Sequence, residues 1–227
     1  MLQEIEPDRL WHAQHPLRLG PLRIETRMTV VRMQDGGLWV HSPIAPTPSL
    51  VHAIRECGDV RHVLAPNRSH HLFFLPFLAE FPGAQGWVAP GLAGKRSDLA
   101  GFPELHDDVP WKHELRPFFM RGLPMLNETA WFHGESGTLV LTDLLFCIGA
   151  STSPLVRLAA RALGVHERLA MSRTMKLTVR DRALLASSVA PLLALPVKRV
   201  IVAHDQVVDE DASAQLKAAF AWLRPNR

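Results

Sequence analysis

Runs of apolar residues separated by turn residues recur along the chain and predict a series of short strands. β-Branched and apolar stretches bounded by Gly, Pro, Asn or Asp are typical of strands. The expected strands cover residues 29–33, 38–41, 60–65, 86–89, 128–133, 138–142 and 197–203. Turn residues between neighbouring strands predict hairpins, one across Asp35-Gly36-Gly37 and one across residues 134–137.

Helices are expected between several of these strands. Apolar residues that recur every three or four positions, with capping residues at the ends, predict helices at residues 47–58, 70–81, 154–163, 181–195 and 211–223. Thr47 and Ser153 each precede a proline, as an N-cap precedes the first helical residue. Pro191 should kink the fourth helix. Residues 91–110, rich in Gly and Pro, predict a loop, and residues 1–227 are interpreted as a single α/β domain.

Composition excludes some classes of protein and partner. The chain has 227 residues, 47% of them hydrophobic and 21% charged, which is typical of a globular protein with a core. The longest weakly polar stretch, residues 183–197, contains two serines and two prolines and falls short of the ~20 apolar residues of a membrane span. The acidic N-terminus lacks a signal pattern. Cys57 and Cys147 alone predict no disulfide framework and a cytoplasmic location.

The charge pattern indicates a solvated surface rather than a nucleic-acid-binding one. The formal net charge is +3, yet the Lys and Arg residues are scattered among acidic ones, with no basic run. We therefore expect no nucleic acid as a partner, and the lack of a membrane span predicts no membrane partner. A small-molecule substrate or ligand is expected, and the sequence leaves the oligomeric state open.

Side chains that can bind metal follow three of the predicted strands. His70 and His71 come after strand 60–65, Asp143 follows strand 138–142, and His204 follows strand 197–203. The carboxyl ends of strands can converge at one edge of a sheet, where α/β folds bind ligands. Imidazole and carboxylate ligands predict one divalent metal ion, with zinc favoured and iron or manganese as alternatives.

Two further residues are expected beside this site. Asn67 follows Pro66 at a strand end and fits an Asx-turn or an N-cap for the helix that carries the histidines. Asn67→Ala should then cost ~1 kcal/mol, and Asn67→Asp should keep most of the cap. Glu128 falls opposite Asp143 in the second hairpin and is expected as a ligand or as a carboxylate that orients a histidine. His133 is excluded, because five residues of strand separate it from Asp143, roughly 16 Å.

Four stretches in this order resemble the metallo-β-lactamase fold: RMTVVRMQDGGLWVHSPI, HVLAPNRSHHLFFLPFL, GTLVLTDLLF, and DRALLASSV with VKRVIVAHDQVV. They are most similar to an uncharacterised bacterial branch of that fold, known only as a domain of unknown function. The likeness runs from about residue 5 to residue 223. It implies an αββα sandwich with a metal site along one edge of the two sheets, and the activity of a metal-dependent hydrolase.

The sequence departs from the signature of that fold, H-x-H-x-D-H, in a way that removes ligands. The matching stretch is Ala-Pro-Asn-Arg-Ser-His-His, so Pro66 and Arg68 stand in place of the first histidine pair. The histidine of the family's third block has no clear match within RGLPMLNETAWFH. One of the two metal positions is therefore lost. The resemblance implies that the other survives as His70, His71, Asp143 and His204.

Two functions are compatible with these features. The first is a hydrolase with one metal ion on those four residues, in which Asp143 and His204 act in catalysis and the metal lowers the pKa of a bound water toward ~7. The alternative is a metal-free protein of the same fold with a binding or structural role, which the missing histidine pair favours. Metal content and sensitivity to a chelator distinguish the two.

Overall fold

The computed structural model describes residues 1–20, 22–149 and 152–223, and its first sheet is built from the N-terminal half of the chain. The strand order is β1-β2-β3-β4-β5-β6. The β4–β5 and β5–β6 pairs are parallel and the others antiparallel. The strands are β1 (Gln3–Glu6), β2 (Leu10–Leu19), β3 (Leu22–Arg32), β4 (Leu38–His41), β5 (Val60–Ala65) and β6 (Gln85–Val88). The helices α1 (Pro48–Cys57) and α2 (Phe74–Glu80) make the parallel crossovers.

The second sheet follows in the C-terminal half, in the order β11-β10-β9-β8-β7, with β9 and β10 parallel. Its strands are β7 (Leu115–Phe119), β8 (Thr129–His133), β9 (Thr138–Val140), β10 (Arg199–Ile201) and β11 (Val207–Val208). The remaining helices are α3 (Pro154–Leu163), α4 (Arg173–Leu177), α5 (Arg182–Leu193) and α6 (Ala212–Ala219), with short 3₁₀ turns η1 (Ser97–Leu99) and η2 (Ala221–Leu223).

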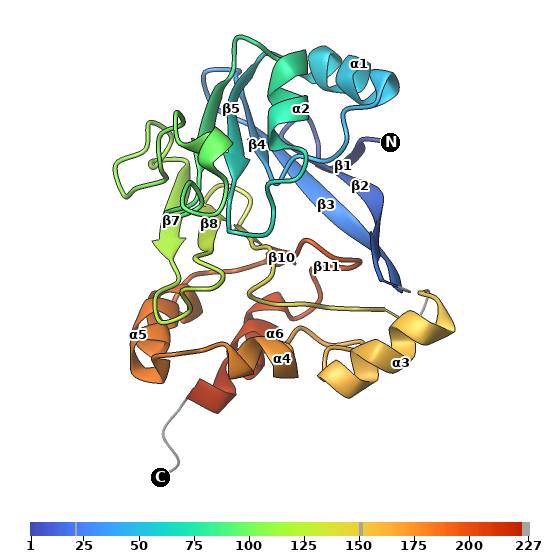
Figure 1. The fold of residues 1–227 in the computed structure, drawn as a ribbon, viewed down its shortest axis with the longest axis vertical. Coiled ribbons are helices and arrows are strands. Elements are labelled where there is room, and N and C mark those ends of the chain that lie inside the picture. The colour runs from blue at the N-terminus through green and yellow to red at the C-terminus, as the bar shows by residue number, and fades with distance from the viewer. Residues whose placement is uncertain (21, 150–151, 224–227) are drawn as a thin grey trace.

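The two sheets stack face to face with helices on their outer sides (Figure 1), and apolar layers fill the spaces between them. Trp39 and Trp131 are fully buried in the layer between the sheets, and their rings meet edge to face at 5.5 Å. A second layer joins the outer face of the first sheet to α1 and α2, and a third joins the outer face of the second sheet to α5 and α6. The predicted αββα sandwich is confirmed.

Strand β4 shows why the sequence folds this way. All four of its residues are buried. Leu38 and Val40 belong to the layer under α1 and α2, whereas Trp39 belongs to the layer between the sheets. Successive side chains of a strand point to opposite faces, so a central strand with both faces covered must be apolar at almost every position.

Several predicted elements are confirmed, and others were missed. Thr47 and Ser153 cap α1 and α3 as expected, each accepting a hydrogen bond from a backbone N–H three residues on. The sequence did not predict β1, β2, β7, β11, α4 or the first half of β3. The β2–β3 hairpin carries polar residues on both strands, such as His12 and Arg27, so neither strand shows a simple apolar alternation.

Helix α2 is shorter than expected, beginning at Phe74 instead of His70. Pro76 lies in its first turn, where a missing backbone N–H leaves no helical hydrogen bond unmade. Residues 67–73 form turns instead. Pro191 lies in the last turn of α5, two residues before the helix ends. In the described part of the chain, no helix has the length and apolar character needed to cross a membrane.

Candidate metal centre

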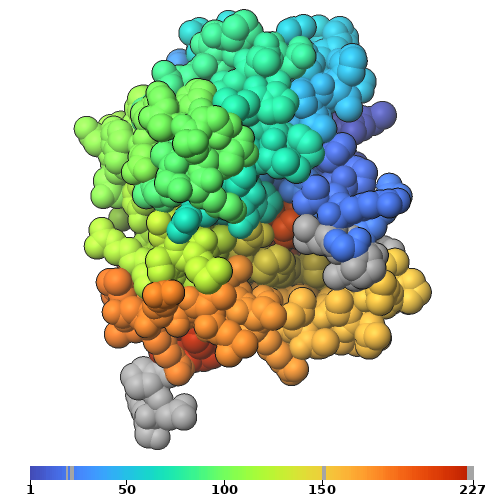
Figure 2. Space-filling view, viewed as in Figure 1, coloured from blue at the N-terminus to red at the C-terminus, as the bar shows by residue number. Residues whose placement is uncertain are grey.

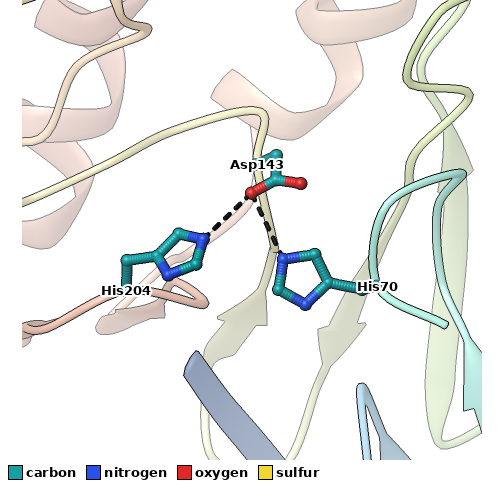
Figure 3. A group of neighbouring side chains, drawn as sticks. All are labelled: His70, Asp143 and His204. Carbon is teal, nitrogen blue, oxygen red and sulfur yellow. Dashed lines mark hydrogen bonds and ion pairs between the residues drawn. The ribbon is translucent and has the colours of Figure 1, made fainter. Parts of the chain in front are cut away.

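Three predicted ligands meet where the two sheets share an edge (Figure 3). His70 follows β5 of the first sheet, and Asp143 and His204 follow β9 and β10 of the second. Nε2 of each imidazole lies 3.2 Å from Oδ1 of Asp143. One ligand atom from each residue lies within 4.8 Å of the others, and we call these three residues the ligand triad.

The orientation of His204 is fixed by the first sheet. Its Nδ1 lies 2.8 Å from the carbonyl oxygen of Glu25 in β3. A carbonyl can only accept, so Nδ1 carries the proton and donates it. Phe146 stacks on the imidazole, with ring centroids 5.6 Å apart and the planes 4° from parallel. Nε2 is therefore held toward Asp143, where it either carries a second proton or offers a lone pair to a cation.

His70 is oriented by a serine at the end of the neighbouring strand. Ser42 directly follows β4, is buried, and places its Oγ 2.7 Å from Nδ1 of His70. If Nε2 binds a cation, Nδ1 keeps the proton and donates it to this hydroxyl. This role of Ser42 was not predicted from the sequence. The available signal was its position at the carboxyl end of a strand, as for the candidate ligands themselves.

The charges of the ligand triad require a positive counterpart. The side chains of His70, Asp143 and His204 are only 9%, 11% and 9% exposed. Burial alone would raise the pKa of Asp143, but the two imidazoles outweigh burial and hold that pKa well below its usual range. Burial alone would lower the pKa of His70, but Asp143 raises it overall. Protons on the imidazoles or one divalent cation can supply the positive charge, and the donor set fits a divalent metal.

Asn67 shapes the turn that carries His70. Its buried Oδ1 accepts hydrogen bonds from the backbone N–H groups of Ser69 and His70, each at 2.7 Å. The predicted Asx-turn is therefore confirmed. The alternative, an N-cap for the following helix, is wrong, because α2 begins only at Phe74.

The amide nitrogen of Asn67 lies between two carboxylates. Nδ2 is 2.7 Å from Oγ1 of Thr142, 3.2 Å from Oδ2 of Asp143 and 3.3 Å from Oε2 of Glu128. An aspartate here would replace that donor by a third acceptor beside two others. This geometry therefore predicts that Asn67→Asp lowers stability, contrary to the expectation from the sequence.

Glu128 holds the main chain around Asp143. Its Oε1 accepts from the backbone N–H of Thr142 at 2.7 Å, and its Oε2 accepts from those of Asp143 and Leu144 at 2.8 and 3.0 Å. The Thr142 hydroxyl also donates to Oε2. Burial raises the pKa of Glu128 and the charge of Asp143 raises it further, against these hydrogen bonds. We call Asn67, Glu128 and Thr142 the Glu128 network. Glu128 thus orients the backbone of the candidate ligand Asp143, and its described hydrogen bonds go to neither His70 nor His204.

His71 is the predicted ligand that lies outside the triad. Among the described residues, the group able to hold a metal is His70, Asp143 and His204. Nδ1 of His71 instead lies 3.0 Å from a guanidinium nitrogen of Arg96. Burial, then the charges of Lys95 and Arg96, lower the pKa of His71. Adjacent residues in a turn point to different sides, so the structure brings only one of the two histidines to the site.

A cavity of about 340 Å³ adjoins the ligand triad on the side of His204. Its lining comes from β3, the loop after β10, α3 and residues that precede α3: Arg23, Ile24, Glu25, Ile148, Thr152, Ser153, Val156, His204 and Asp205. Figure 2 shows a recess on one face of the molecule, between the teal part of the chain and the yellow and orange helices, with red residues at its floor. The triad is therefore next to a space that can hold a small molecule.

Comparison with known proteins shows the family of this chain. A family model described as a domain of unknown function, DUF4336, matches residues 7–186. The chain belongs to the DUF4336 family. No curated protein matches this DUF4336 chain.

Solved structures show which fold this DUF4336 protein has. A metallo-β-lactamase from Pontibacter korlensis is 13% identical, with a TM-score of 0.64 over 100% of this chain and 99% of the other. A metallo-β-lactamase from Hirschia baltica is 10% identical, with a TM-score of 0.66 over 100% and 99%. A metal-soaked flavodiiron core from Synechocystis is 13% identical, with a TM-score of 0.67 over 98% of this chain and 60% of the other. The chain therefore has the metallo-β-lactamase fold.

Proposed function

We propose that this protein is a metal-dependent hydrolase that binds one divalent metal ion on His70, Asp143 and His204. The observation that carries the proposal is the convergence of Nε2, Oδ1 and Nε2 in a buried site where both Nδ1 atoms already have partners. Two imidazoles and one carboxylate form a donor set that leaves a coordination position open, as catalytic zinc sites do. Zinc is favoured, and iron and manganese are the alternatives.

Each residue around the site has a defined task in this proposal. A divalent metal, when bound, supplies Lewis acidity that activates water and polarises an oxygen of the substrate. Asp143 stays ionised at neutral pH, since its pKa is held well below the usual range despite its burial. The carbonyl of Glu25 keeps the proton of His204 on Nδ1, and Ser42 does the corresponding work for His70. Both Nε2 atoms thus point toward Asp143.

The cavity beside His204 supports a small-molecule substrate. Ile24, Ile148 and Val156 give it apolar walls. A volume of about 340 Å³ suits a compact molecule that places its reacting group at the triad and an apolar part against these walls. Cys57 and Cys147 are both free thiols, which supports the proposal that the protein works in a reducing cytoplasm.

Metal content tests the proposal most directly. Protein purified without added metal should contain a divalent ion or take up about one per chain on titration. Asp143→Ala and His204→Ala should each lower the affinity steeply while the fold persists, as circular dichroism can show. Full occupancy in both variants would contradict the proposal. A parent protein that takes up no metal would favour the alternative, a metal-free binding protein.

Hydrolysis is then tested with metal-loaded protein. A panel of small esters, thioesters, phosphate esters and lactams should contain a substrate whose cleavage stops with a chelator and returns with added metal. His204→Ala should be inactive on that substrate. Cleavage that persists in the chelator at the parent rate would exclude a metal-dependent reaction.

A further inference from the structure

Arg27 is a buried arginine of β3 whose side chain leaves its own sheet and reaches the second one. It is 3% exposed. One of its Nη atoms donates to the carbonyl oxygens of Val202 and Gln206, at 2.7 and 3.1 Å, and the other donates to that of Asp205. Nε lies 3.2 Å from Nδ1 of His12. Three of these partners are main-chain atoms on either side of His204.

The segment that receives these bonds is also tied to the chain around Cys147, where Asp205 forms an isolated β-bridge with Cys147 and the backbone N–H of Gln206 donates to the Cys147 carbonyl. Residues 202–206, here called the His204 loop, lie between β10 and β11, outside both strands. Asp205 has a φ of 63°, a left-handed conformation that is strained for a residue with a side chain. Gln14 of β2 adds a second donor to the Asp205 carbonyl, at 3.0 Å. The guanidinium therefore holds three main-chain carbonyls of this loop, those of Val202, Asp205 and Gln206, on one side chain of β3.

The same strand also fixes the imidazole. Glu25, two residues before Arg27, offers the carbonyl oxygen that accepts from Nδ1 of His204. β3 pairs with β2 over nearly its whole length, from Leu22 opposite Leu19 to Val31 opposite Leu10. Ring and backbone of this candidate ligand are thus both tied to one rigid hairpin of the opposite sheet.

We infer that Arg27 is a positioning residue for the metal centre, holding the His204 loop so that Nε2 of His204 faces Asp143. The inference rests on the proposed function. Hydrogen-bond partners behind a metal ligand set its orientation and hence its affinity for the ion. A planar guanidinium can hold several carbonyls at once, whereas the single ammonium of a lysine cannot reproduce that geometry.

The charge state of the cluster is suited to this role. Burial lowers the pKa of Arg27 to about 10, so it remains a cation at neutral pH. Burial, and then the charge of Arg27, lower the pKa of His12 to about 4, so His12 is neutral and can accept from Nε. A fixed cation with these acceptors is unlike a solvated surface arginine, whose contacts exchange with water.

The test compares Arg27→Lys with Arg32→Lys. Arg32 lies on the same strand and also binds a main-chain carbonyl, that of Cys57, but at the other end of β3. The readouts are zinc affinity by competition with a chelator and the exchange-protected Nδ1 proton of His204 in NMR spectra of the metal-free protein. Arg27→Lys should lower zinc affinity roughly 10- to 100-fold and weaken the Nδ1 signal. Arg32→Lys should change neither, even where both variants lose thermal stability.

Each outcome decides between a positioning and a merely structural arginine. Parent affinity and an unchanged Nδ1 signal in Arg27→Lys would overturn the inference. If the parent binds no zinc, the proposed function fails, and the Nδ1 signal alone then decides whether Arg27 positions His204. If Arg27→Lys does not fold, Arg27→Gln replaces the guanidinium by a neutral amide and is measured in its place. A reduced zinc affinity or Nδ1 signal in that variant supports the inference, and no change in either overturns it.

Discussion

The ligand triad and the Glu128 network lie side by side, and they differ in how their polar atoms are matched. In the Glu128 network both carboxylate oxygens of Glu128 face donors, from three backbone N–H groups, a hydroxyl and an amide. In the triad, Oδ1 of Asp143 faces Nε2 of two imidazoles. The Nδ1 atoms of these rings are already hydrogen-bonded, to Ser42 for His70 and to the carbonyl of Glu25 for His204. The carboxylate of the Glu128 network therefore has all its donors within the protein, whereas the ligand triad needs added positive charge from protons or a metal ion.

This difference separates what each cluster contributes. Buried polar groups that are fully hydrogen-bonded stabilise and specify one structure, whereas buried groups left unmatched are costly. The Glu128 network should therefore stabilise the fold whether or not metal is present. The contribution of the triad should depend on metal and on pH.

Removing Glu128 should have the largest effect on stability. Glu128→Ala leaves three buried backbone N–H groups without an acceptor, so we expect a loss of at least ~3 kcal/mol in the free energy of unfolding. Denaturant unfolding should give the same loss with zinc and with a chelator. Glu135→Ala, in the same hairpin but on the surface and paired with Arg9, should cost less than ~1 kcal/mol. A loss that vanishes in the chelator would mean that Glu128 acts through the metal.

Substitution of Asn67 should come next in size. Asn67→Ala removes the acceptor of the Asx-turn and the shared amide donor, at a cost of ~2 kcal/mol. Asn67→Asp keeps the acceptor but puts a carboxylate against Glu128 and Asp143, so it should be at least as destabilising. Urea unfolding of both variants at neutral pH measures this. An aspartate variant as stable as the parent would show that the amide is not needed between the two carboxylates.

The pH dependence of stability should reverse when zinc is added. Asp143 raises the folded-state pKa of His70 above its ordinary 6.5, against the effect of burial. That contribution is complete below pH 6.5 and is lost as the pH rises through the raised pKa. In metal-free protein, the stability advantage of the parent over His70→Gln should therefore shrink as the pH rises above that value. With zinc it should grow, because ligands must lose protons to bind metal. Parallel trends in both conditions would exclude metal binding through His70.

His71→Ala should have the smallest effect and so serves as the matched control for its neighbour. Its contact with Arg96 lies outside the triad, and a partly exposed contact of this kind contributes no more than ~1 kcal/mol. Zinc affinity, measured by chelator competition, should stay near that of the parent, while His70→Ala loses it. Equal losses in the two variants would place both histidines on the metal.

The parts of the site that the sequence predicts are those that follow strands. Asp143 and His204 come directly after short apolar strands, so the convergence of their side chains could be expected from the order of the elements alone. Hairpin register placed Glu128 beside Asp143 and put His133 opposite Thr138, and the structure has that pairing. The metal-binding role of these residues remains a prediction.

The parts that were missed depend on main-chain atoms or on side-chain direction. The carbonyl of Glu25 fixes His204, but a carbonyl oxygen is present at every residue and leaves no trace in the sequence. Arg27 sits in a hairpin strand without apolar alternation, so neither its strand nor its contacts could be predicted. The sequence alone does not distinguish His70 from His71, because both are histidines at adjacent positions. Only the Asx-turn built by Asn67 decides which of the two turns toward Asp143.

The wide spacing of the three ligands along the chain has a kinetic consequence. His70 and Asp143 are 73 residues apart, and Asp143 and His204 are 61 apart. Contacts of such long range form late, because the intervening chain must be ordered first. A metal ion held by all three candidate ligands would bind only after the sheets have docked. It would then stabilise the docked sheets against separation, so that bound metal lengthens the lifetime of the native protein against heat and proteases.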